Sequence, residues 1–323
     1  QCDWSSDVCS SDLSMPAVSI VVPCYNAADF IAEALSSVQR QTFRDWECIV
    51  VDDCSTDDSA SIIKDMAAED PRIIALCLEQ NGGASAARNA GFEKATGKWL
   101  TLLDADDAYA SDRLERLVEL AESNDADMVF DNQSIADYPS TVPVDVAFHW
   151  LTDDVKPFSS EDFFVESANF GRSINPGYMK PLFRRSFIEK NRLRYDLSFR
   201  SGQDYMLYAS AFANEPRCFA TQYCGYIYRR RVGSLSRSGG SHLRNHARLS
   251  DEILARFGER LSRASQVALI ARQRYFLRVA ALRYMHAALE DRKPVLALTK
   301  ALAHPGSFIA AAAAIRRSSM QRR

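Results

Sequence analysis

The chain has 323 residues, of which 47% are hydrophobic and 25% are charged. This composition is typical of a folded globular protein and leaves room for one large domain or two ordinary ones. No apolar stretch reaches the roughly 18 residues that a membrane-spanning helix needs. The eight cysteines form no C-x-x-C pair and no Cys/His metal spacing, which favours a reduced, cytoplasmic setting.

Charge is distributed unevenly along the chain. Residues 229–323 carry 20 Lys and Arg against 5 Asp and Glu, a net +15, whereas the first 228 residues carry 19 against 37, a net −18. A basic C-terminal region suits peripheral contact with an anionic membrane or a phosphate-bearing lipid. A solvated face on ordinary helices explains it equally well.

Residues 1–14 differ from the rest of the chain. They are rich in Ser and Asp, show no hydrophobic period and lack the charged start and apolar core of a signal peptide. We expect a non-native or disordered tail, with the fold beginning at Met15.

From residue 17 onwards, short apolar runs alternate with amphipathic segments. The runs predict strands, and the segments between them predict helices at 29–39, 57–68, 84–95 and 112–123. The predicted strands are 17–22, 47–51, 72–76, 98–103 and 127–130. This alternation predicts βαβ units in a mainly parallel central sheet, with ligands bound beyond the carboxyl ends of its strands.

The second half of the chain is harder to interpret. Residues 134–175 contain three prolines and have weak periodicity, so we expect loops with a short helix at 160–167. Further on, the pattern predicts a strand at 177–183, helices at 185–191 and 203–213, a pair of strands within 217–229, and helices after Ser250. We therefore expect an α/β domain over residues 15–230 and a basic helical region over 231–323.

Three carboxylates follow the predicted strand 98–103: Asp104, Asp106 and Asp107. Acids this close repel one another unless a cation or hydrogen-bond donors lie among them. Hard oxygen ligands with room for phosphate oxygens suit Mg²⁺ or Mn²⁺. The alternative is a strand-to-helix turn in which Asp107 or Ser111 caps the next helix.

Two further loops at the same predicted sheet edge are polar. Asp52 and Asp53 end a strand, where a carboxylate can accept the N3–H of uracil or the hydroxyls of a ribose. A helix cap accounts for the nearby Ser55 and Asp57 but does not require two adjacent acids. The Gly-rich stretch 81–91 leads into a helix with Arg88 one turn in, which suits phosphate, although Arg88 is as well explained as an ion-pair partner.

Two later features are candidates for chemistry. Asp204 begins a predicted helix, where it either complements the helix dipole or acts as a general base on an acceptor hydroxyl. The basic stretch 228–236 either closes over a diphosphate or joins two domains as an exposed linker.

Taken in order, four motifs resemble the inverting family-2 glycosyltransferases over residues 16–230. They are Pro23-x-Tyr25-Asn26, Val51-Asp52-Asp53-x-Ser55-x-Asp57, Asn81-x-Gly83…Ala87-Arg88-Asn89-x-Gly91 and Leu103-Asp104-x-Asp106-Asp107. The resemblance implies a GT-A fold, which is a Rossmann-like α/β domain with a mixed, mostly parallel central sheet. It also implies metal-dependent transfer of a sugar from a nucleotide-diphosphate sugar, UDP-linked, to an acceptor hydroxyl.

The resemblance also implies roles for individual residues. Asp53 would bind the uracil, Asp104 the ribose, Asp106 with Asp107 the Mg²⁺ or Mn²⁺, and Asp204 would be the base. The other residues expected to bind the nucleotide-sugar are Pro23, Tyr25, Asn26, Gly83, Arg88 and Arg229. The sequence departs from the family pattern at Gln203, where a Glu is usual, which puts the acceptor-side geometry in question.

The Tyr-Arg…Ser-x-Ser ending and the basic tail are similar to glucosyltransferases of bacterial exopolysaccharide clusters, such as succinoglycan assembly. That implies a glycan or polyprenyl-diphosphate-linked acceptor, a site at the inner face of the cell membrane and no nucleic-acid partner. One alternative is a sugar-nucleotide nucleotidyltransferase, against which stands Pro23-Cys24-Tyr25-Asn26 where a Gly-rich loop is usual. A non-catalytic nucleotide-sugar-binding subunit is the other.

Overall fold

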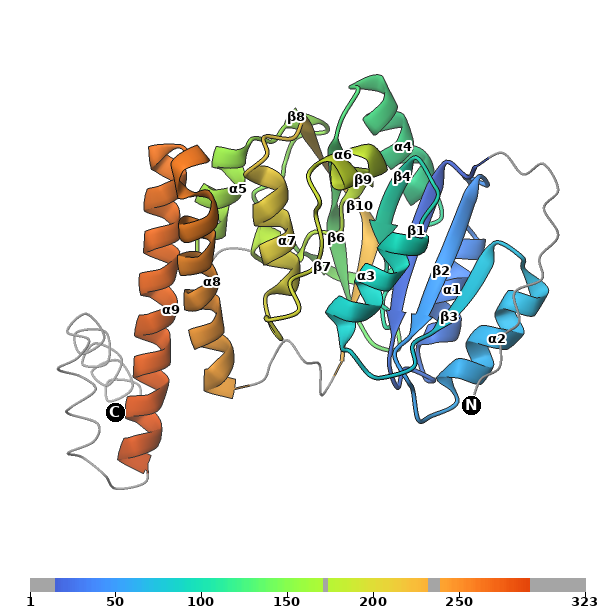
Figure 1. The fold of residues 1–323 in the computed structure, drawn as a ribbon, viewed down its shortest axis with the longest axis horizontal. Helices are drawn as coiled ribbons and strands as arrows, with labels where there is room; N and C mark the ends of the chain where they lie inside the picture. Colours follow the sequence, from blue (N-terminus) through green and yellow to red (C-terminus); the bar gives the residue numbers. More distant parts are fainter. Residues whose placement is uncertain (1–14, 171–173, 232–238, 291–323) are drawn as a thin grey trace. The chain divides into compact units, whose positions relative to one another are not determined.

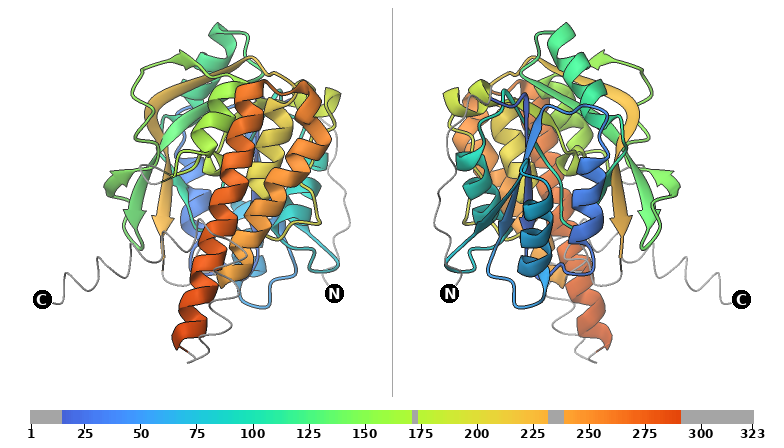
Figure 2. Two further views of the ribbon diagram at one scale, coloured as in Figure 1. Left: turned by 90° about the vertical axis from the view of Figure 1, so that its left-hand side faces the viewer. Right: turned by 90° about the vertical axis from the view of Figure 1, so that its right-hand side faces the viewer.

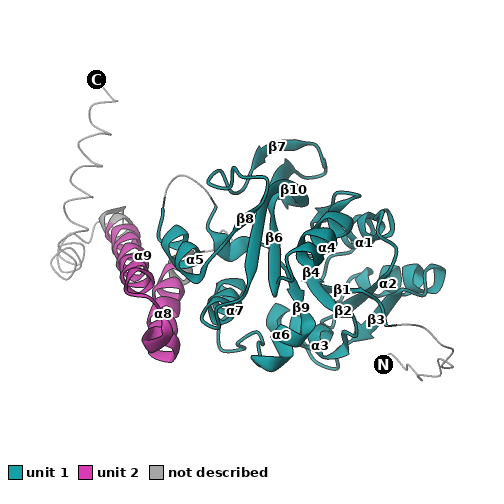
Figure 3. Cartoon of the chain, turned by 90° about the horizontal axis from the view of Figure 1, so that it is seen from above, with its two compact units in different colours: residues 1–232 teal, residues 233–323 magenta. Residues whose placement is uncertain are grey.

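The computed structural model describes residues 15–170, 174–231 and 239–290. The chain divides into two compact units, residues 1–232 and 233–323 (Figure 3). The predicted tail at residues 1–14 lies outside the described residues, as do residues 232–238 and 291–323 of the predicted basic helical region.

The first unit begins with alternating strands and helices, close to the predicted bounds (Figure 1). The strands are β1 (Val18–Cys24), β2 (Trp46–Asp52), β3 (Ile73–Cys77) and β4 (Trp99–Leu102). The helices are α1 (Ile31–Gln39), α2 (Ser59–Glu69), α3 (Ala84–Lys94) and α4 (Arg113–Ser123). β1, β2 and β4 are fully or almost fully buried, as strands in the middle of a parallel sheet are, whereas β3 lies at the edge of the sheet and only its Ile73 is buried.

The sheet continues through a mixed half built from later strands. These are β5 (Ala108–Tyr109), β6 (Met128–Asp137), β7 (Pro143–Val146), β8 (Lys156–Pro157), β9 (Leu182–Arg184) and β10 (Cys218–Arg230). The order is β3-β2-β1-β4-β9-β6-β10-β5, with β7 on β6 and β8 on β10. β1 runs parallel to β2 and β4, whereas β9 runs antiparallel to both β4 and β6. This is the mixed, mostly parallel sheet that the resemblance implies.

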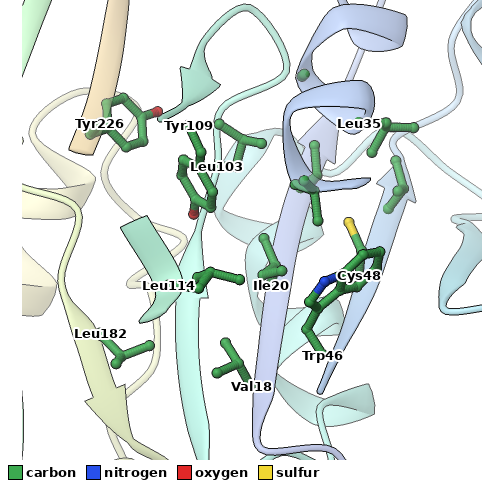
Figure 4. Packing of buried hydrophobic residues seen from close by; sticks show 14 of the residues in the cluster. Val18, Ile20, Leu35, Trp46, Cys48, Leu103, Tyr109, Leu114, Leu182 and Tyr226 are labelled. Carbon is green, nitrogen blue, oxygen red and sulfur yellow. The ribbon is translucent and has the colours of Figure 1, made fainter. Parts of the chain in front are cut away.

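One face of the sheet packs on α1, α2 and α4. Ile20 and Trp46 from the strands meet Leu35 of α1 and Leu114 of α4 in a single buried cluster (Figure 4). The opposite face takes α3, where Gly91 allows close approach, since a Cβ there would lie 2.3 Å from Val21 Cγ1. Helices on both faces leave the strand ends as the place where polar loops gather.

The remaining helices of this unit are α5 (Ser160–Ser167), α6 (Arg185–Lys190) and α7 (Gln203–Phe212). α5 begins at a capping box between Ser159 and Asp162, which explains why this short helix could be predicted.

Three predictions for the later part of the chain need correction, and three short strands were not predicted. The pair of strands predicted within 217–229 is one strand, β10, which pairs with β6 in parallel. The pairing register shifts between Thr221 and Tyr226, but the strand continues. The strand predicted at 177–183 is a 3₁₀ turn, η1 (Pro176–Tyr178), followed by the three-residue β9. The short strands β5, β7 and β8 were not predicted, because each is set by pairing with a partner distant in sequence. Lastly, the final helices begin before Ser250, at residue 239.

The second unit consists of α8 (Gly239–Phe257), the 3₁₀ turn η3 (Gly258–Arg260) and α9 (Arg263–Glu290). α8 and α9 lie side by side as a hairpin (Figure 2). Buried Arg272 of α9 donates to the backbone carbonyl of His246 at 2.9 Å and to Ser250 Oγ at 3.0 Å, so polar contacts join the two helices. Within the described ranges, every helix is too short or too polar to cross a membrane.

Candidate active site

The strand register brings the predicted polar loops to one edge of the sheet. Cys24 at the end of β1 is paired with Asp52 at the end of β2, and Asp52 with Cys77 at the end of β3. The loop after β4 lies beside β1, because Leu103 donates its backbone N–H to the carbonyl of Val21. Asp53 and Asp104 therefore follow strands on either side of β1, and Pro23 lies near the end of β1 at the same edge.

Asp53 is buried and anchors the glycine turn that precedes α3. Its two carboxylate oxygens accept the backbone N–H groups of Gly82 and Gly83, each at 2.7 Å. Gly83 has φ +80°, a conformation that favours glycine, and Asn81 donates to the backbone carbonyl of Asp53 at 2.9 Å. The turn and the acid thus form one rigid unit.

The loop after β1 is held by the loop after β2. Asn26 adopts a left-handed conformation, and its Oδ1 accepts the N–H of Thr56 at 2.8 Å. Asp57 accepts the backbone N–H groups of Ala28 and Ser59, each at 3.0 Å, but the N-cap residue of α2 is Asp58, whose side chain makes no cap hydrogen bond. Tyr25 points outwards and is 52% exposed, so its ring is available to a ligand.

Asp104 and Asp204 share two buried cations. Arg88 of α3 contacts Asp104 Oδ1 at 2.8 Å and Asp204 Oδ1 at 3.3 Å. Lys180, between η1 and β9, contacts Asp104 Oδ2 at 2.8 Å and Asp204 Oδ2 at 3.0 Å. Tyr195 adds a hydrogen bond to Asp204 Oδ1 at 2.9 Å.

These contacts shift the protonation of the cluster. Burial by itself would raise the pKa of Asp104, but the charges of Lys180 and Arg88 outweigh it and hold the pKa below its ordinary value. Burial would likewise lower the pKa of Lys180, and the charges of Asp104 and Asp204 instead raise it. Asp104 and Lys180 are therefore both ionised at neutral pH.

Asp107 is also buried, but its donors come from β10. Tyr226 donates its hydroxyl to Asp107 Oδ2 at 2.6 Å, and the backbone N–H of Arg229 reaches Oδ1 at 2.9 Å. Burial, followed by the charges of Asp106 and Asp104, raises the pKa of Asp107. The helix-capping alternative for Asp107 does not hold, because α4 begins after Asp112 and Asp107 bonds to β10 instead.

The two arginines nearest to this loop, Arg229 and Arg231, make different contacts. Arg229, expected to bind the nucleotide-sugar, is 3% exposed, and its Nε donates to the backbone carbonyl of Asp106 at 2.7 Å. Arg231, rather than Arg229, reaches a carboxylate, with Nε 2.7 Å from Asp106 Oδ2. In this structure Arg229 therefore shapes the loop, while Arg231 carries the charge beside Asp106.

Of the three acids in this loop, Asp106 is the one suited to hold a divalent metal ion. In the described part of the chain, no three His, Cys, Asp or Glu side chains come together as a metal cage. Both carboxylate oxygens of Asp104 and of Asp107 already accept bonds from protein groups, whereas the recorded contact of the Asp106 carboxylate is to Arg231 through Oδ2. Mg²⁺ characteristically takes one or two carboxylates together with substrate phosphates, so Asp106 suits that role.

Sequence reasoning missed Lys180, Tyr195 and Tyr226. Lys180 stands in a stretch that reads as a strand, and Tyr195 lies in a segment between two predicted helices. Their contacts depend on elements that are distant in sequence, so no local pattern marks them. The available signal is the excess of acids at the edge of the sheet, which requires partners of some kind.

Comparisons with known proteins identify the family to which this chain belongs. The family described as Glycosyl transferase family 2 matches residues 19–197. The succinoglycan biosynthesis protein ExoO of Rhizobium meliloti is 39% identical over 228 residues, which are 69% of this chain and 63% of that protein. The chain therefore spans less than two thirds of that relative. A second protein of the same organism, ExoU, is 33% identical over 304 residues, 90% of this chain and 84% of that protein.

Among solved structures, S. aureus TarS 1–349 in complex with UDP-GlcNAc superposes with a TM-score of 0.62. The match is 18% identical and covers 90% of this chain and 91% of that one, so it shows the fold. The chain has the GT-A fold and belongs to glycosyltransferase family 2.

Proposed function

We propose that the protein transfers a sugar from a nucleotide-diphosphate sugar, UDP-linked, to a hydroxyl of a glycan or lipid-linked acceptor, with inversion at the anomeric carbon. The observation that carries this is the joining of Asp104 and Asp204 through Arg88 and Lys180. It places a donor-side acid and a candidate base in one cluster, although the two are far apart in the sequence.

On the donor side, Asp53 is our candidate for the base and Asp104 for the ribose. A carboxylate oxygen has two lone pairs, so the N–H groups of Gly82 and Gly83 leave Asp53 able to accept the N3–H of uracil. The exposed ring of Tyr25 is suited to stack on the base, beside Pro23 and Asn26.

The diphosphate would lie over the N-terminus of α3 beside Gly83, while Arg88, which is paired with Asp104 and Asp204, would act on the nucleotide-sugar by holding these acids in place. Asp106 would hold Mg²⁺ or Mn²⁺, with Asp107 shaping the loop behind it. Such an ion neutralises charge as the leaving group departs. Arg231 supplies positive charge at the same carboxylate, and Arg229 keeps the loop in place through its backbone carbonyls.

On the acceptor side, Asp204 would take the proton of the attacking hydroxyl. The acceptor oxygen forms its bond to the anomeric carbon as the bond to the diphosphate oxygen breaks, and UDP leaves. One displacement from the opposite face gives inversion, so a product with retained configuration would refute this mechanism.

The biological setting follows from the relatives. ExoO and ExoU are named for succinoglycan biosynthesis, and we infer the same class of task, assembly of a bacterial surface or exopolysaccharide. We place the protein in the cytoplasm at the inner face of the membrane, with the basic second unit in contact with anionic lipid. Flotation with vesicles of anionic lipid tests this, and equal behaviour of the full chain and one ending near residue 232 would refute the contact.

The experiment that tests the proposed function is calorimetric titration with UDP, with and without Mn²⁺, followed by a panel of UDP-sugars. We expect Mn²⁺-dependent binding that Asp106→Ala abolishes. No binding of UDP, with or without Mn²⁺, would refute the assignment of Asp53 and the choice of nucleotide. Release of pyrophosphate from UTP and a sugar phosphate would instead identify a nucleotidyltransferase.

A further inference from the structure

Four charged side chains form a closed ring at the candidate site. Going round it, Asp104 contacts Arg88, Arg88 contacts Asp204, Asp204 contacts Lys180, and Lys180 returns to Asp104, over distances of 2.8 to 3.3 Å. The two cations are almost completely buried, with side chains 9% and 7% exposed, whereas the two carboxylates are 26% and 17% exposed. The acids therefore face the site, and the cations support them from behind.

The backbone of Lys180 is fixed by a second buried ion pair. Arg113 of α4 donates to the carbonyl of Lys180 at 2.6 Å and forms a two-point contact with Asp131 of β6, both bonds being 2.9 Å. Arg113 and Asp131 are fully buried. The ammonium of Lys180 is thus held at a defined point, within reach of one oxygen from each acid.

The ammonium group of Lys180 is paired with two carboxylates at once, those of Asp104 and Asp204. Without it, the Oδ2 atoms of Asp104 and Asp204 lose the cation that they share, and the two negative charges repel each other. Among the described residues, Arg88 at 3.3 Å and the Tyr195 hydroxyl would then remain as recorded partners of the Asp204 carboxylate, both on Oδ1.

We propose that Lys180 is a positioning residue that holds the Asp204 carboxylate in its productive orientation and ties it to Asp104 on the donor side. This rests on the proposed function, in which Asp204 is the base. A purely structural ion pair would stabilise the fold without affecting the reaction.

The test compares three variants in the full chain: Lys180→Met, Lys180→Arg and Tyr195→Phe. Lys180→Met has a similar length and no charge, whereas Lys180→Arg restores the charge. Tyr195→Phe is the matched control, since it removes a hydrogen bond to Asp204 and leaves the Lys180–Asp104 pair intact. Thermal unfolding first establishes that each variant is folded.

Two readouts need no knowledge of the acceptor. One is the affinity for UDP by calorimetry. The other is hydrolysis of whichever UDP-sugar the wild type turns over fastest, with water as the acceptor, measured as UDP release. The charged and titratable groups around Asp204 are Arg88, Lys180, Tyr195, Tyr208 and Asp104.

For Lys180→Met we expect hydrolysis at saturating donor to fall about 10-fold or more, since a hydrogen bond to a buried charge is lost. UDP affinity should also fall, through Asp104. Lys180→Arg should recover part of the rate, and Tyr195→Phe should slow hydrolysis while leaving UDP affinity within about 2-fold of the wild type.

A folded Lys180→Met protein whose hydrolysis rate is within about 2-fold of the wild type would overturn the proposal. So would a Lys180→Arg variant as slow as Lys180→Met, because charge would then not be what matters. If the wild type binds no UDP, the proposed function fails and this inference fails with it. Normal UDP binding combined with an unaffected Lys180→Met variant refutes the inference alone.

Discussion

The buried pair Arg113–Asp131 offers the sharpest test of how the site is supported. Both side chains have no exposed surface, and the guanidinium makes two bonds of 2.9 Å to the carboxylate. Asp131 also accepts the backbone N–H of Gly225 at 3.1 Å, so it joins α4 to β6 and β10. In Asp131→Asn the shape is kept, but the charge of Arg113 is left without its partner.

Breaking a buried pair by removing one partner typically costs 3–5 kcal/mol, since the remaining charge has no compensation. For a folded unit of this size, each kcal/mol lowers the melting temperature by about 2–4 °C, so Asp131→Asn should melt at least about 6 °C below the wild type. Replacing both residues, as in Arg113→Met/Asp131→Leu, should recover much of the loss, because no unpaired charge remains.

The assay is thermal unfolding followed by circular dichroism at neutral pH, with Arg116→Met as the control. Arg116 is on the same helix, and its contact with Asp112 is exposed, so its loss should cost about 0–1 kcal/mol. A single variant Asp131→Asn that melts within about 2 °C of the wild type would refute the reasoning. A double variant Arg113→Met/Asp131→Leu that is less stable than each of its single variants would also refute it. Packing rather than charge would then determine the loss of stability.

Three further predictions concern the base, the packing of α3 and the acid stability. Asp204→Asn should lower turnover of a UDP-sugar by about 100-fold or more with UDP affinity nearly unchanged, and equal turnover would place the base elsewhere. Gly91→Ala should destabilise the protein by about 1–3 kcal/mol in urea unfolding, because its Cβ would lie 2.3 Å from Val21; an unchanged midpoint would show that the helix can shift freely. The pKa of Asp104 is below its ordinary value when folded, so its contribution to stability is present above about pH 4 and is lost as pH falls further. Asp104→Asn should therefore show a weaker loss of stability below about pH 4, measured by unfolding at several pH values, and an unchanged acid profile would contradict this.

The parallel half of the fold could be predicted from the sequence because its signals are local. The strands at 17–22 and 47–51 are short apolar runs between amphipathic helices, and the structure has β1 and β2 within two residues of those bounds. The mixed half follows from long-range pairing. β9 has three residues and is a strand only because β4 and β6 lie on either side of it. A three-residue segment carries too little pattern to be recognised.

The candidate site divides in the same way. Asp53, Asp104 and Asp106 could be found because acids at the ends of predicted strands are unusual without ligands or donors. The positions of Arg229 and Lys180 could not, because which cation reaches which acid depends on how β9 and β10 enter the sheet. Neighbouring arginines such as Arg229 and Arg231 look alike in the sequence, yet one bonds to backbone carbonyls and the other to a carboxylate.

The loop 104–107 is where the two halves of the sheet meet, and this explains its three acids. Each acid is matched by groups from the second half of the chain: Asp104 by Lys180, Asp106 by Arg231, and Asp107 by Tyr226. The parallel half alone would leave three adjacent carboxylates with Arg88 as their cation. Forming the mixed half supplies the donors that occupy the second oxygen of Asp104 and both oxygens of Asp107, whereas the recorded contact of the Asp106 carboxylate is to Arg231 through Oδ2. The part of the loop available to a metal and a diphosphate is thus determined by the half of the sheet that also brings in Asp204.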